Sequence, residues 1–469
     1  MTRTLECECP RCRELAAELA ASQKEVERLR LELAKAQKNS STSSKPPSSD
    51  IVKAKPAPQE GDAAKRSIGG QPGHPKHERE PFPPEQVTEF VPHTLDACPD
   101  CAGELRRNGH LQRVVQQVDI VTPPLTIAQH TCPEYWCAHC QKSCWAPLPL
   151  PIERGGLVGP NLTALIAFMK GFCHASFSTI RKFLRDVMGV TIARGTLCKV
   201  INKVSQALEG TYEELLAMLP TEARLNIDET GHKDRGDRWW TWCFRADLYT
   251  LYHIDSRRNV EVLIETLVAD FNGVIGCDYF GAYRKYMRLF GVELQFCLAH
   301  LIRDVKFLTT LPDQDTQAYG ARVREALRAL FAVIHRREEL PAATFAHALQ
   351  AARERVLDAG CNDVPPTRAA QNLAQRLRKH GHAYFTFVTT PGMEPTNNVA
   401  EQAIRFVVID RLITQGTRGA AGQKWSERIW TVIATCAQQG LSLHAFLQQA
   451  ITNWFTGAAA PSLLPEGAA

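Results

Sequence analysis

Two aspartates in the middle of the chain each close a short apolar segment that is typical of a buried strand. Asp228 ends the segment RLNID (224–228), and Asp278 ends the segment GVIGCD (273–278). Apolar strands of one sheet are often neighbours, and two adjacent buried carboxylates repel each other unless a cation lies between them. Carboxylate oxygens suit Mg²⁺ or Mn²⁺. Two such ions, ~3.5–4 Å apart, hold both oxygens of an in-line phosphodiester displacement.

A third carboxylate would complete such a site, and Glu401 is the best candidate. It lies in the segment EPTNNVAEQAIR (394–405), where Pro395 and the polar residues after it form a helix start. Glu401 falls in an early turn of that helix. The alternative is an exposed ion pair with Arg405, four residues on. A dinucleotide or sugar enzyme also stays open, although the sequence has no glycine fingerprint and no Walker lysine.

Paired cysteines are the second group of residues with a chemical use. The chain has 16 cysteines. Two CxxC pairs, Cys98/Cys101 and Cys137/Cys140, are separated by 35 residues. Each pair brings two thiolates onto one tight turn, so we expect a structural four-cysteine Zn²⁺ site in a zinc-ribbon-like module over residues 86–150. The gap is wider than the common spacing of ~15–20 residues, and incidental buried cysteines are the alternative.

A helix and a linker precede this module. Residues 1–38 are predicted to hold one helix, from about residue 12, because apolar residues follow the alternating spacing of a coiled coil. The positions are Leu15, Leu19, Ser22, Val26, Leu29 and Leu33. Three heptads are barely enough for a stable pair, so packing on its own chain is the alternative. Residues 39–85 are rich in Ser, Pro and Lys, which predicts a flexible linker.

A helical region is predicted over residues 155–220. Apolar residues recur with a helical period in 177–188, Gly189 marks a turn, and a second helix is predicted over 191–204. This order is typical of a helix-turn-helix, whose second helix enters the major groove of DNA. The candidate DNA-binding residues are Arg181, Lys182, Arg194, Lys199 and Lys203. An ordinary helical core with a basic outer face is the equal alternative.

Strands and helices alternate after residue 221. Two strands, 238–244 and 249–254, are predicted to form a hairpin, and a helix follows over 259–271. A last short strand comes before a helix that begins at about His300. Residues 313–385 have a helical pattern and lie within the 123 positions that separate Asp278 from Glu401.

Composition limits the class of protein. The 469 residues suggest about three domains. A hydrophobic content of 44% excludes a wholly disordered protein, and a formal charge of +5 permits a nucleic-acid partner without requiring one. No uncharged apolar run reaches the ~18 residues that span a bilayer. The N-terminus lacks the apolar core of a secretory signal, so we expect a cytoplasmic protein with no membrane partner.

Five motifs occur in an order that resembles the transposases of the Insertion Sequence 66 family, which are bacterial DDE transposases. They are DETG from Asp228, RWW (238–240), CDYFGAY around Asp278, CLAH ending at His300, and PTNNVAEQAIR around Glu401. The heptad helix, the SSKPPSSD segment (43–50), the GGQPGH segment (69–74) and the two CxxC pairs also match the layout of that family. The similarity therefore covers nearly the whole chain.

The resemblance implies a multidomain α/β protein with a ribonuclease-H-like catalytic core. The core would begin over residues 221–310, be interrupted by a helical insertion over 311–390, and continue with the Glu401 helix and C-terminal helices over 391–456, before a tail over 457–469. The coiled-coil helix, the zinc-ribbon-like module and the helix-turn-helix-like DNA-binding region would precede it.

The resemblance also implies a catalytic triad of Asp228, Asp278 and Glu401 that binds Mg²⁺ or Mn²⁺. Glu229 is not expected to be part of it, because strand alternation turns this side chain to the other face. Cys297 and His300 resemble a recurrent pair of the family, to which we assign no role.

As a hypothesis, the enzyme cuts at the ends of an insertion element and joins the 3′-OH ends to target DNA. One metal ion would activate the attacking water, and the same site would then direct the 3′-OH. The implied partners are the element ends, target DNA, further copies of the chain in a homodimer or higher oligomer, and accessory proteins encoded by the element. Two alternatives stay open: a ribonuclease-H-like nuclease that cuts without joining, and a non-catalytic DNA-binding relic of a transposase. The complete triad disfavours the relic.

Overall fold

The structure, a computed structural model, describes residues 10–38, 42, 82–87, 90, 125–132, 134–137, 139, 141–145, 147–268 and 271–465. Residues 53–129, with 187–189, form one unit, in which the 3-10 turn η2 (Pro84–Gln86) is described. The other unit holds the rest of the chain. Most of the predicted linker and most of the predicted zinc module lie outside the described residues.

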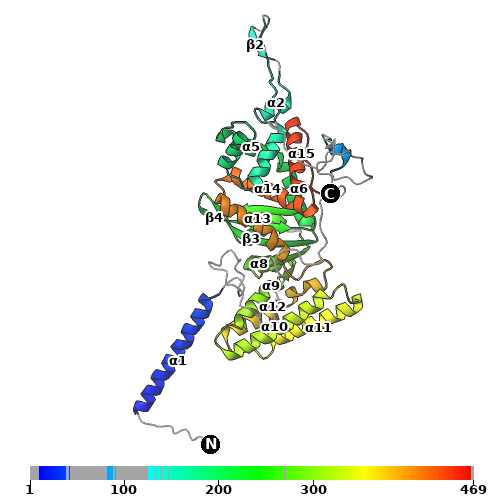
Figure 1. Cartoon of the computed structure of the whole chain (residues 1–469). Coiled ribbons are helices and arrows are strands. Elements are labelled where there is room, and N and C mark those ends of the chain that lie inside the picture. The colour runs from blue at the N-terminus through cyan, green and yellow to red at the C-terminus, as the bar shows by residue number, and fades with distance from the viewer. Residues whose placement is uncertain are drawn as a thin grey trace, which may run out of the picture. The chain divides into compact units, whose positions relative to one another are not determined.

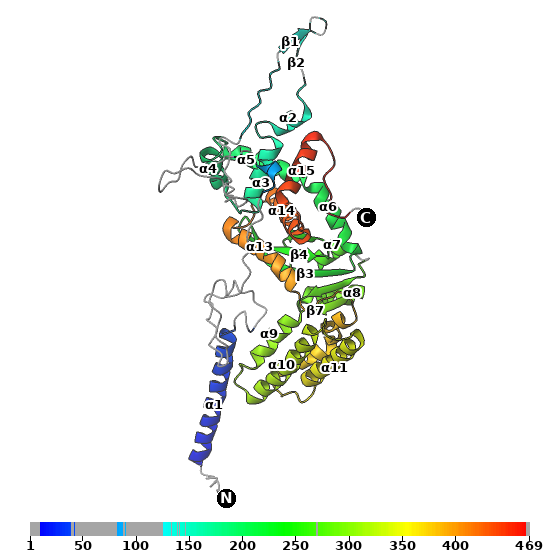
Figure 2. The same cartoon turned by 45° about the vertical axis from the view of Figure 1, so that its right-hand side comes forward.

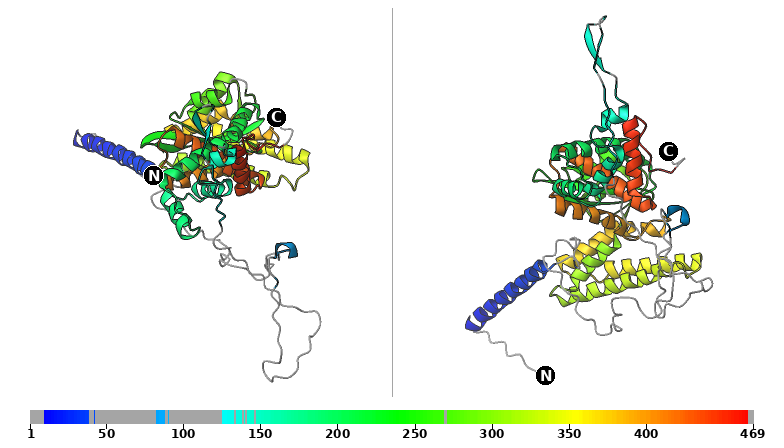
Figure 3. Two further views of the ribbon diagram at one scale, coloured as in Figure 1. Left: turned by 90° about the horizontal axis from the view of Figure 1, so that it is seen from above. Right: turned by 45° about the horizontal axis from the view of Figure 1, so that its top comes forward.

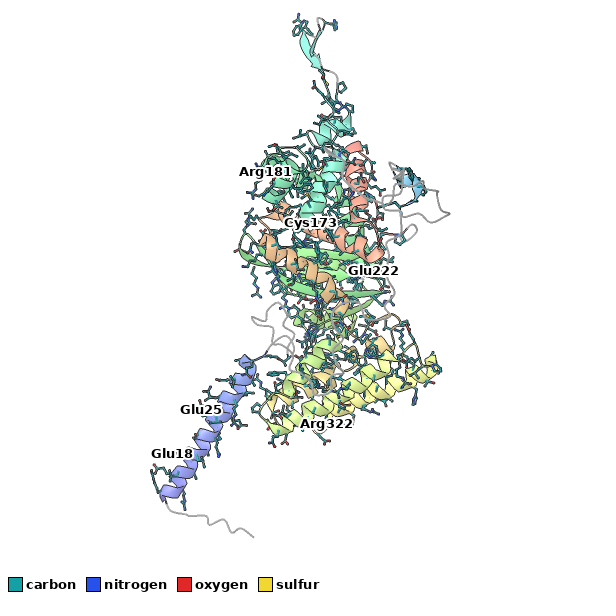
Figure 4. All side chains as sticks on the ribbon, viewed as in Figure 1. Glu18, Glu25, Cys173, Arg181, Glu222 and Arg322 are labelled. Atoms are coloured by element: carbon teal, nitrogen blue, oxygen red, sulfur yellow. The ribbon has the colours of Figure 1, made fainter. Side chains whose placement is uncertain are left out.

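The N-terminal helix α1 (Pro10–Ala36) confirms the helix predicted from residue 12 and begins two residues earlier. Its heptad positions are exposed, namely Leu15, Leu19, Val26, Leu29 and Leu33. Arg28 forms ion pairs with Glu25 and Glu32 at 2.6 Å each, along the surface of the same helix. Figure 4 labels Glu18 and Glu25 on α1. Its apolar stripe is therefore presented on the surface of the helix.

A five-stranded mixed sheet forms the centre of the larger unit (Figure 1). Its strands are β3 (Arg224–Asp234), β4 (Asp237–Arg245), β5 (Thr250–Asp255), β6 (Val274–Cys277) and β7 (Glu293–Phe296). They lie in the order β5-β4-β3-β6-β7. The strand β4 is antiparallel to both of its neighbours, β3 and β5, whereas β3, β6 and β7 run parallel. The mixed α/β architecture predicted from the sequence is confirmed.

The central strand β3 is longer than predicted, so Asp228 lies within the strand and not at its end. Beyond Asp228, the polar segment 230–234 continues to pair with β4 as a two-stranded ribbon, as far as Asp234 opposite Asp237. Arg235 and Gly236 join the two strands with positive φ angles of 52° and 95°. Two positive φ angles are the geometry of a type I′ turn, which matches the twist of a hairpin.

Different helices cover the two faces of the sheet (Figure 2). The helix α13 (Asn398–Thr414) packs on β3 and β4, and Arg411 from this helix donates to Thr230 Oγ1 at 3.1 Å. The helices α7 (Val260–Leu267) and α8 (Gly281–Phe290) pack against each other, and Tyr283 of α8 reaches Glu229. Even-numbered residues of β3 therefore face α13, and odd-numbered residues face α8.

The edge strand β5 is sealed by α14 (Ala420–Gln439). Its backbone N–H groups at Thr250, Tyr252 and Ile254 donate to side-chain oxygens of the helix, at 3.2, 3.1 and 2.6 Å. The acceptors are Thr435, Thr431 and Glu427. The donors are two residues apart on the strand, and the acceptors are four residues apart on the helix. These spacings match, because two strand residues rise about 6.7 Å and four helical residues rise about 6 Å.

Helices fill the chain between β7 and α13, as the pattern over 313–385 predicts. They are α9 (Leu298–Leu308), α10 (Gln314–His335), α11 (Ala342–Cys361) and α12 (Arg368–His380). The long helices α10 and α11 run side by side (Figure 3, right). The 3-10 turns η4 (His382–Tyr384) and η5 (Thr386–Val388) then cover the outer side of β7, where Thr386 Oγ1 donates to Leu294 O at 2.7 Å.

Helices make up the region predicted to be helical over residues 155–220, and the first of them begins five residues earlier, at Leu150. They are α2 (Leu150–Gly155), α3 (Pro160–Gly171), α4 (Phe177–Asp186), α5 (Arg194–Ala207) and α6 (Glu209–Met218), and the 3-10 turn η3 (Leu219–Thr221) follows. The C-terminal helix α15 (Leu443–Thr456) packs on α3. Before α2, β1 (Glu134–Cys137) and β2 (Lys142–Trp145) form an antiparallel hairpin. None of the described helices is both long and apolar enough to cross a membrane.

Candidate active site

Asp228 and Asp278 lie at the same level of two neighbouring parallel strands. The register of β3 and β6 pairs Arg224 with Val274 and Asn226 with Gly276. Paired residues of the two strands thus differ by 50 in number, and Asp228 and Asp278 differ by the same amount. Asp278 lies one residue beyond the end of β6. Asp278 Oδ1 accepts a hydrogen bond of 2.8 Å from the N–H of Phe280, which fixes the carboxylate at the start of α8.

Glu401 approaches this pair from the first turn of α13. Its carboxylate lies 3.6 Å from His300 Nδ1 and 3.6 Å from Arg303 Nη2, both on α9. Among the described residues, the Glu401 carboxylate therefore contacts His300 and Arg303, and the alternative ion pair with Arg405 is not formed. Both Glu401 Oε1 and His300 Nδ1 are buried and lack a hydrogen-bond partner there. Glu401 therefore presents an oxygen atom whose hydrogen-bonding capacity is unused.

The carboxylates influence one another electrostatically. Burial raises the pKa of Asp228 well above its usual range, and the negative charges of Glu229, Asp278 and Glu401 raise it further. Burial lowers the pKa of His300, although the neighbouring Glu401 opposes this shift. A cluster of negative charge in a partly closed site is costly unless cations compensate it.

Asn397 anchors the Glu401 helix to the central strand. Its side chain is almost fully buried, with 1% of the residue exposed. Asn397 Nδ2 donates to Ile227 O at 2.9 Å, and Oδ1 accepts from Asn226 Nδ2 at 2.8 Å. Gly276 on the adjacent strand leaves room for this contact, because a Cβ there would lie 2.4 Å from Asn226 Nδ2. The start of α13 is thus tied directly beside Asp228.

The CLAH segment forms the third side of the site. Cys297 Sγ accepts a hydrogen bond of 3.2 Å from the N–H of Asn397, and Leu298 N–H donates to Pro395 O at 2.9 Å. The ligand atoms of Cys297, His300 and Glu401 lie within 4.8 Å of one another. These bonds join the beginning of α9 to the beginning of α13, although a helical segment of the chain separates them.

Glu229 lies on the opposite face of β3 from α13, in a buried ionic contact. Its carboxylate pairs with Arg258 at 2.7 Å and accepts a hydrogen bond of 2.5 Å from Tyr283 Oη. Burial and the nearby Asp278 raise its pKa, whereas Arg258 opposes the shift. The Arg258 guanidinium also lies 4.2 Å from the centre of the Phe280 ring. This network supports the backbone under the two aspartates.

The basic residues predicted to bind DNA are placed differently within α4 and α5. Arg181, Lys182, Arg194 and Lys199 are exposed, and Lys203 is half-buried. Arg181, labelled in Figure 4, donates from Nε to Ile192 O at 3.2 Å, and Lys203 donates to Gly155 O at 3.0 Å. The turn between the helices contains Gly189 with a φ of 71°, and α5 begins three residues later than predicted.

The four predicted zinc ligands are Cys98, Cys101, Cys137 and Cys140. Cys98, Cys101 and Cys140 lie outside the described residues, and Cys137 is described only as the last residue of β1.

The sequence alone assigns no role in the site to several residues, although two of them, Tyr283 and Asn397, lie within the CDYFGAY and PTNNVAEQAIR motifs. The full set is Asn226, Asn397, Arg258, Tyr283 and Arg303. Asn397 belongs to a polar helix start, and this local role alone accounts for an asparagine at the position, so the sequence does not reveal the contact with β3. Arg303 sits on an amphipathic helix, where a basic residue is ordinary.

Comparisons with known proteins agree with the resemblance. Residues 155–424, more than half of the chain, match the family described as Transposase IS66 family. Residues 6–80 match a family of unknown function, DUF6444. "Uncharacterized protein y4jD" of Sinorhizobium fredii (strain NBRC 101917 / NGR234) is 25% identical over 390 residues, which cover 77% of this chain and 75% of that protein. "Uncharacterized protein y4hP" of the same strain is 21% identical over 412 residues, 80% and 74% of the two chains. The chain therefore belongs to the IS66 family of transposases.

Proposed function

We propose that this chain is a DDE transposase, which cuts DNA at the ends of an insertion element and joins the 3′-OH ends to target DNA. The observation that carries the proposal is the convergence of Asp228, Asp278 and Glu401 from two parallel strands and one helix. Phosphodiester displacement assisted by two metal ions needs carboxylates gathered in this way.

The residues present fit Mg²⁺ or Mn²⁺. Asp228, Asp278 and Glu401 supply the hard oxygen ligands that these ions prefer. A divalent charge would offset the repulsion that helps to raise the pKa of Asp228, and Glu401 Oε1 has no hydrogen-bond partner that would compete. When bound, the ions would activate the attacking oxygen and stabilise the charge on the transferred phosphate.

The chain's own residues hold the three carboxylates in place. The N–H of Phe280 orients Asp278, and Asn397 fixes the helix that carries Glu401. His300 and Arg303 flank Glu401 and limit the orientations of its carboxylate. Phosphoryl transfer depends mainly on such positioning and on charge stabilisation, so no covalent protein nucleophile is required.

A ribonuclease-H-like core, over residues 221–310 and 391–456, is part of the proposal. Its support is the sheet, in which three antiparallel strands continue into two parallel ones in the order β5-β4-β3-β6-β7, with helices on both faces. The helices α10–α12 fall within residues 311–390, where we propose the insertion.

DNA contacts by the helical region over residues 155–220 are a further part. In a helix-turn-helix, the beginning of the second helix reaches the major groove. Arg194 and Lys199 are exposed near the beginning of α5, and Lys182 is exposed on α4. Arg181 is exposed as well, although its Nε donates to Ile192 O. We expect these four residues to contact phosphates, and Lys203 to stabilise the fold through its backbone carbonyl partner.

The remaining elements complete the proposal. The exposed apolar stripe of α1 supports pairing with a second copy of the chain as a coiled coil. The two CxxC pairs are the basis on which we also propose a structural Zn²⁺ site in residues 86–150. DNA as substrate implies a location in the bacterial cytoplasm, with the nucleoid, and accessory proteins of the element are expected partners.

Strand transfer of labelled element-end DNA in the presence of Mg²⁺ tests the proposal. Wild type should give joined products, and Asp278→Ala and Glu401→Ala should abolish them. Glu394→Ala is a matched control, because Glu394 is exposed and lies just before the same helix. Cleavage without joining would identify a nuclease, and tight binding without chemistry would identify a DNA-binding relic. Either of these two results would overturn the proposal.

A further inference from the structure

A pocket of about 560 Å³ opens between α8, α9 and α12, next to the carboxylate cluster. Its size falls within the range of small-ligand sites, roughly 300–1,000 Å³. The residues that matter on its wall are Tyr279, Arg284, Asp304, Arg376, Lys379 and His380. Tyr279 directly follows Asp278, and Asp304 directly follows Arg303, which faces Glu401. The pocket and the cluster therefore share two segments of the chain.

The wall of this pocket carries an excess of positive charge. Asp304 is matched by Arg376 in an ion pair of 2.8 Å. Arg284 and Lys379 have no ion-pair partner in the described part of the chain. The guanidinium groups of Arg376 and Arg284 lie 4.0 and 4.3 Å from the centre of the Tyr279 ring. An anion would be attracted to this wall.

Unsatisfied nitrogen atoms point to the same kind of ligand. Arg284 Nε, Arg376 Nη2 and His380 Nδ1 are buried and lack a hydrogen-bond partner. The side chains that carry these atoms line the pocket, and their charged donors suit a ligand with several acceptor oxygens. Burial lowers the pKa of His380, and the positive charges of Lys379 and Arg284 lower it further.

We propose that this pocket binds a phosphate of the DNA strand that runs into the carboxylate cluster, close to the phosphodiester under attack. The inference rests on the proposed function, and it assigns a DNA contact to the helical segment that precedes α13. Arg284, Arg376 and Lys379 supply the charged donors for phosphate oxygens. Tyr279 holds the guanidinium groups of Arg376 and Arg284 at the pocket wall by cation–π contacts. Backbone phosphate contacts set the register of a strand, so the pocket would position the reacting bond.

DNA binding without catalysis tests the pocket separately from the chemistry. The probe is a labelled duplex that carries an end of the element, titrated by fluorescence anisotropy without added Mg²⁺ at several salt concentrations. Lys379→Gln and Arg284→Gln should each weaken binding and lower the salt slope by about 1, the loss of one phosphate contact. Arg368→Gln on α12 and Arg288→Gln on α8 are matched controls, because both residues are exposed and outside the pocket. Equal thermal unfolding midpoints ensure that all variants are folded.

Replacing the phosphates of the probe one at a time with a neutral methylphosphonate locates the phosphate that contacts the pocket. At one position near the cleaved bond, the replacement should weaken binding by wild type but not by Lys379→Gln, as expected for an interacting pair. Pocket variants that bind like the controls would overturn the inference. So would variants that lose affinity for inorganic phosphate and keep it for DNA, because the pocket would then serve a free anion. If the predicted binding loss occurs but wild type performs no Mg²⁺-dependent chemistry, the proposed function fails and the phosphate contact remains.

Discussion

Removing the side chain of Asn397 should loosen the Glu401 helix from the central strand. The side chain makes two hydrogen bonds, to Ile227 O and from Asn226 Nδ2, at 2.9 and 2.8 Å. Each buried group that loses its partner costs about 1–3 kcal/mol. Ile227 O belongs to a paired strand and Asn226 is only half-buried, so the lower part of that range applies to each. We expect Asn397→Ala to reduce the free energy of unfolding by about 2–4 kcal/mol.

The same substitution should slow DNA cleavage more than it weakens DNA binding. Asn397 comes directly before α13, and Glu401 lies in the first turn of that helix. A misplacement of about 1 Å at a reacting group costs on the order of 10²-fold in rate. The expected result is therefore about a hundredfold slower Mg²⁺-dependent cleavage at unchanged affinity for DNA without added Mg²⁺.

Urea unfolding and single-turnover cleavage measure the two effects. Asn398→Ala is the matched control, because Asn398 is the next residue and is exposed. The reasoning is refuted if Asn397→Ala unfolds at the same urea concentration as Asn398→Ala and cleaves at the rate of the wild type. Loss of stability without loss of rate would show that Glu401 keeps its place by other contacts.

Three other perturbations test separate parts of the structure. Gly276→Ala should destabilise the protein by about 1–3 kcal/mol in urea unfolding, because its Cβ would lie 2.4 Å from Asn226 Nδ2 and 2.6 Å from Met393 Cε; an unchanged midpoint would contradict this. Burial, helped by the charge of Arg411, lowers the pKa of His232 from 6.5 to about 4. The folded protein therefore favours the neutral imidazole of His232. Its contribution to the free energy of unfolding should be fully present above pH 6.5 and should fall by at most ~3 kcal/mol as the pH drops to 4. The stability difference between wild type and His232→Gln should vary over that interval, and a constant difference would count against the argument. Mg²⁺ at about 100 times its Kd should stabilise wild type by about 2.7 kcal/mol in thermal unfolding but should not stabilise Asp278→Asn, whereas equal stabilisation would mean binding elsewhere.

Local patterns are sufficient to predict many of the elements around the site. The apolar run before Asp278 predicts β6, since a buried strand needs little context, and the polar series after Pro395 predicts the start of the Glu401 helix. The end of β3 is harder to predict, because the polar residues 230–234 have no apolar alternation. Their pairing depends on β4 and on the turn at Arg235 and Gly236.

The contacts that hold the site together cannot be predicted from local patterns. Asn226 and Asn397 are 171 positions apart, and their hydrogen bond depends on the whole sheet and the returning helix. Strand alternation turns Glu229 away from the cluster, and its contacts with Arg258 and Tyr283 agree with this. The pattern does not reveal, however, that this carboxylate is buried and ionically paired, since its partners come from later segments.

The closed edges of the sheet restrict how copies of this chain can associate. An open edge strand is a template for any extended peptide, and so for aggregation and for β-augmentation by a partner. Side chains of α14 occupy the free N–H groups of β5, and the turns η4 and η5 cover the outer side of β7. One molecule therefore cannot extend its sheet into the next. If copies of the chain associate as proposed, helical surfaces such as α1 would make the contact, and the sheet that carries the aspartates would stay undisturbed.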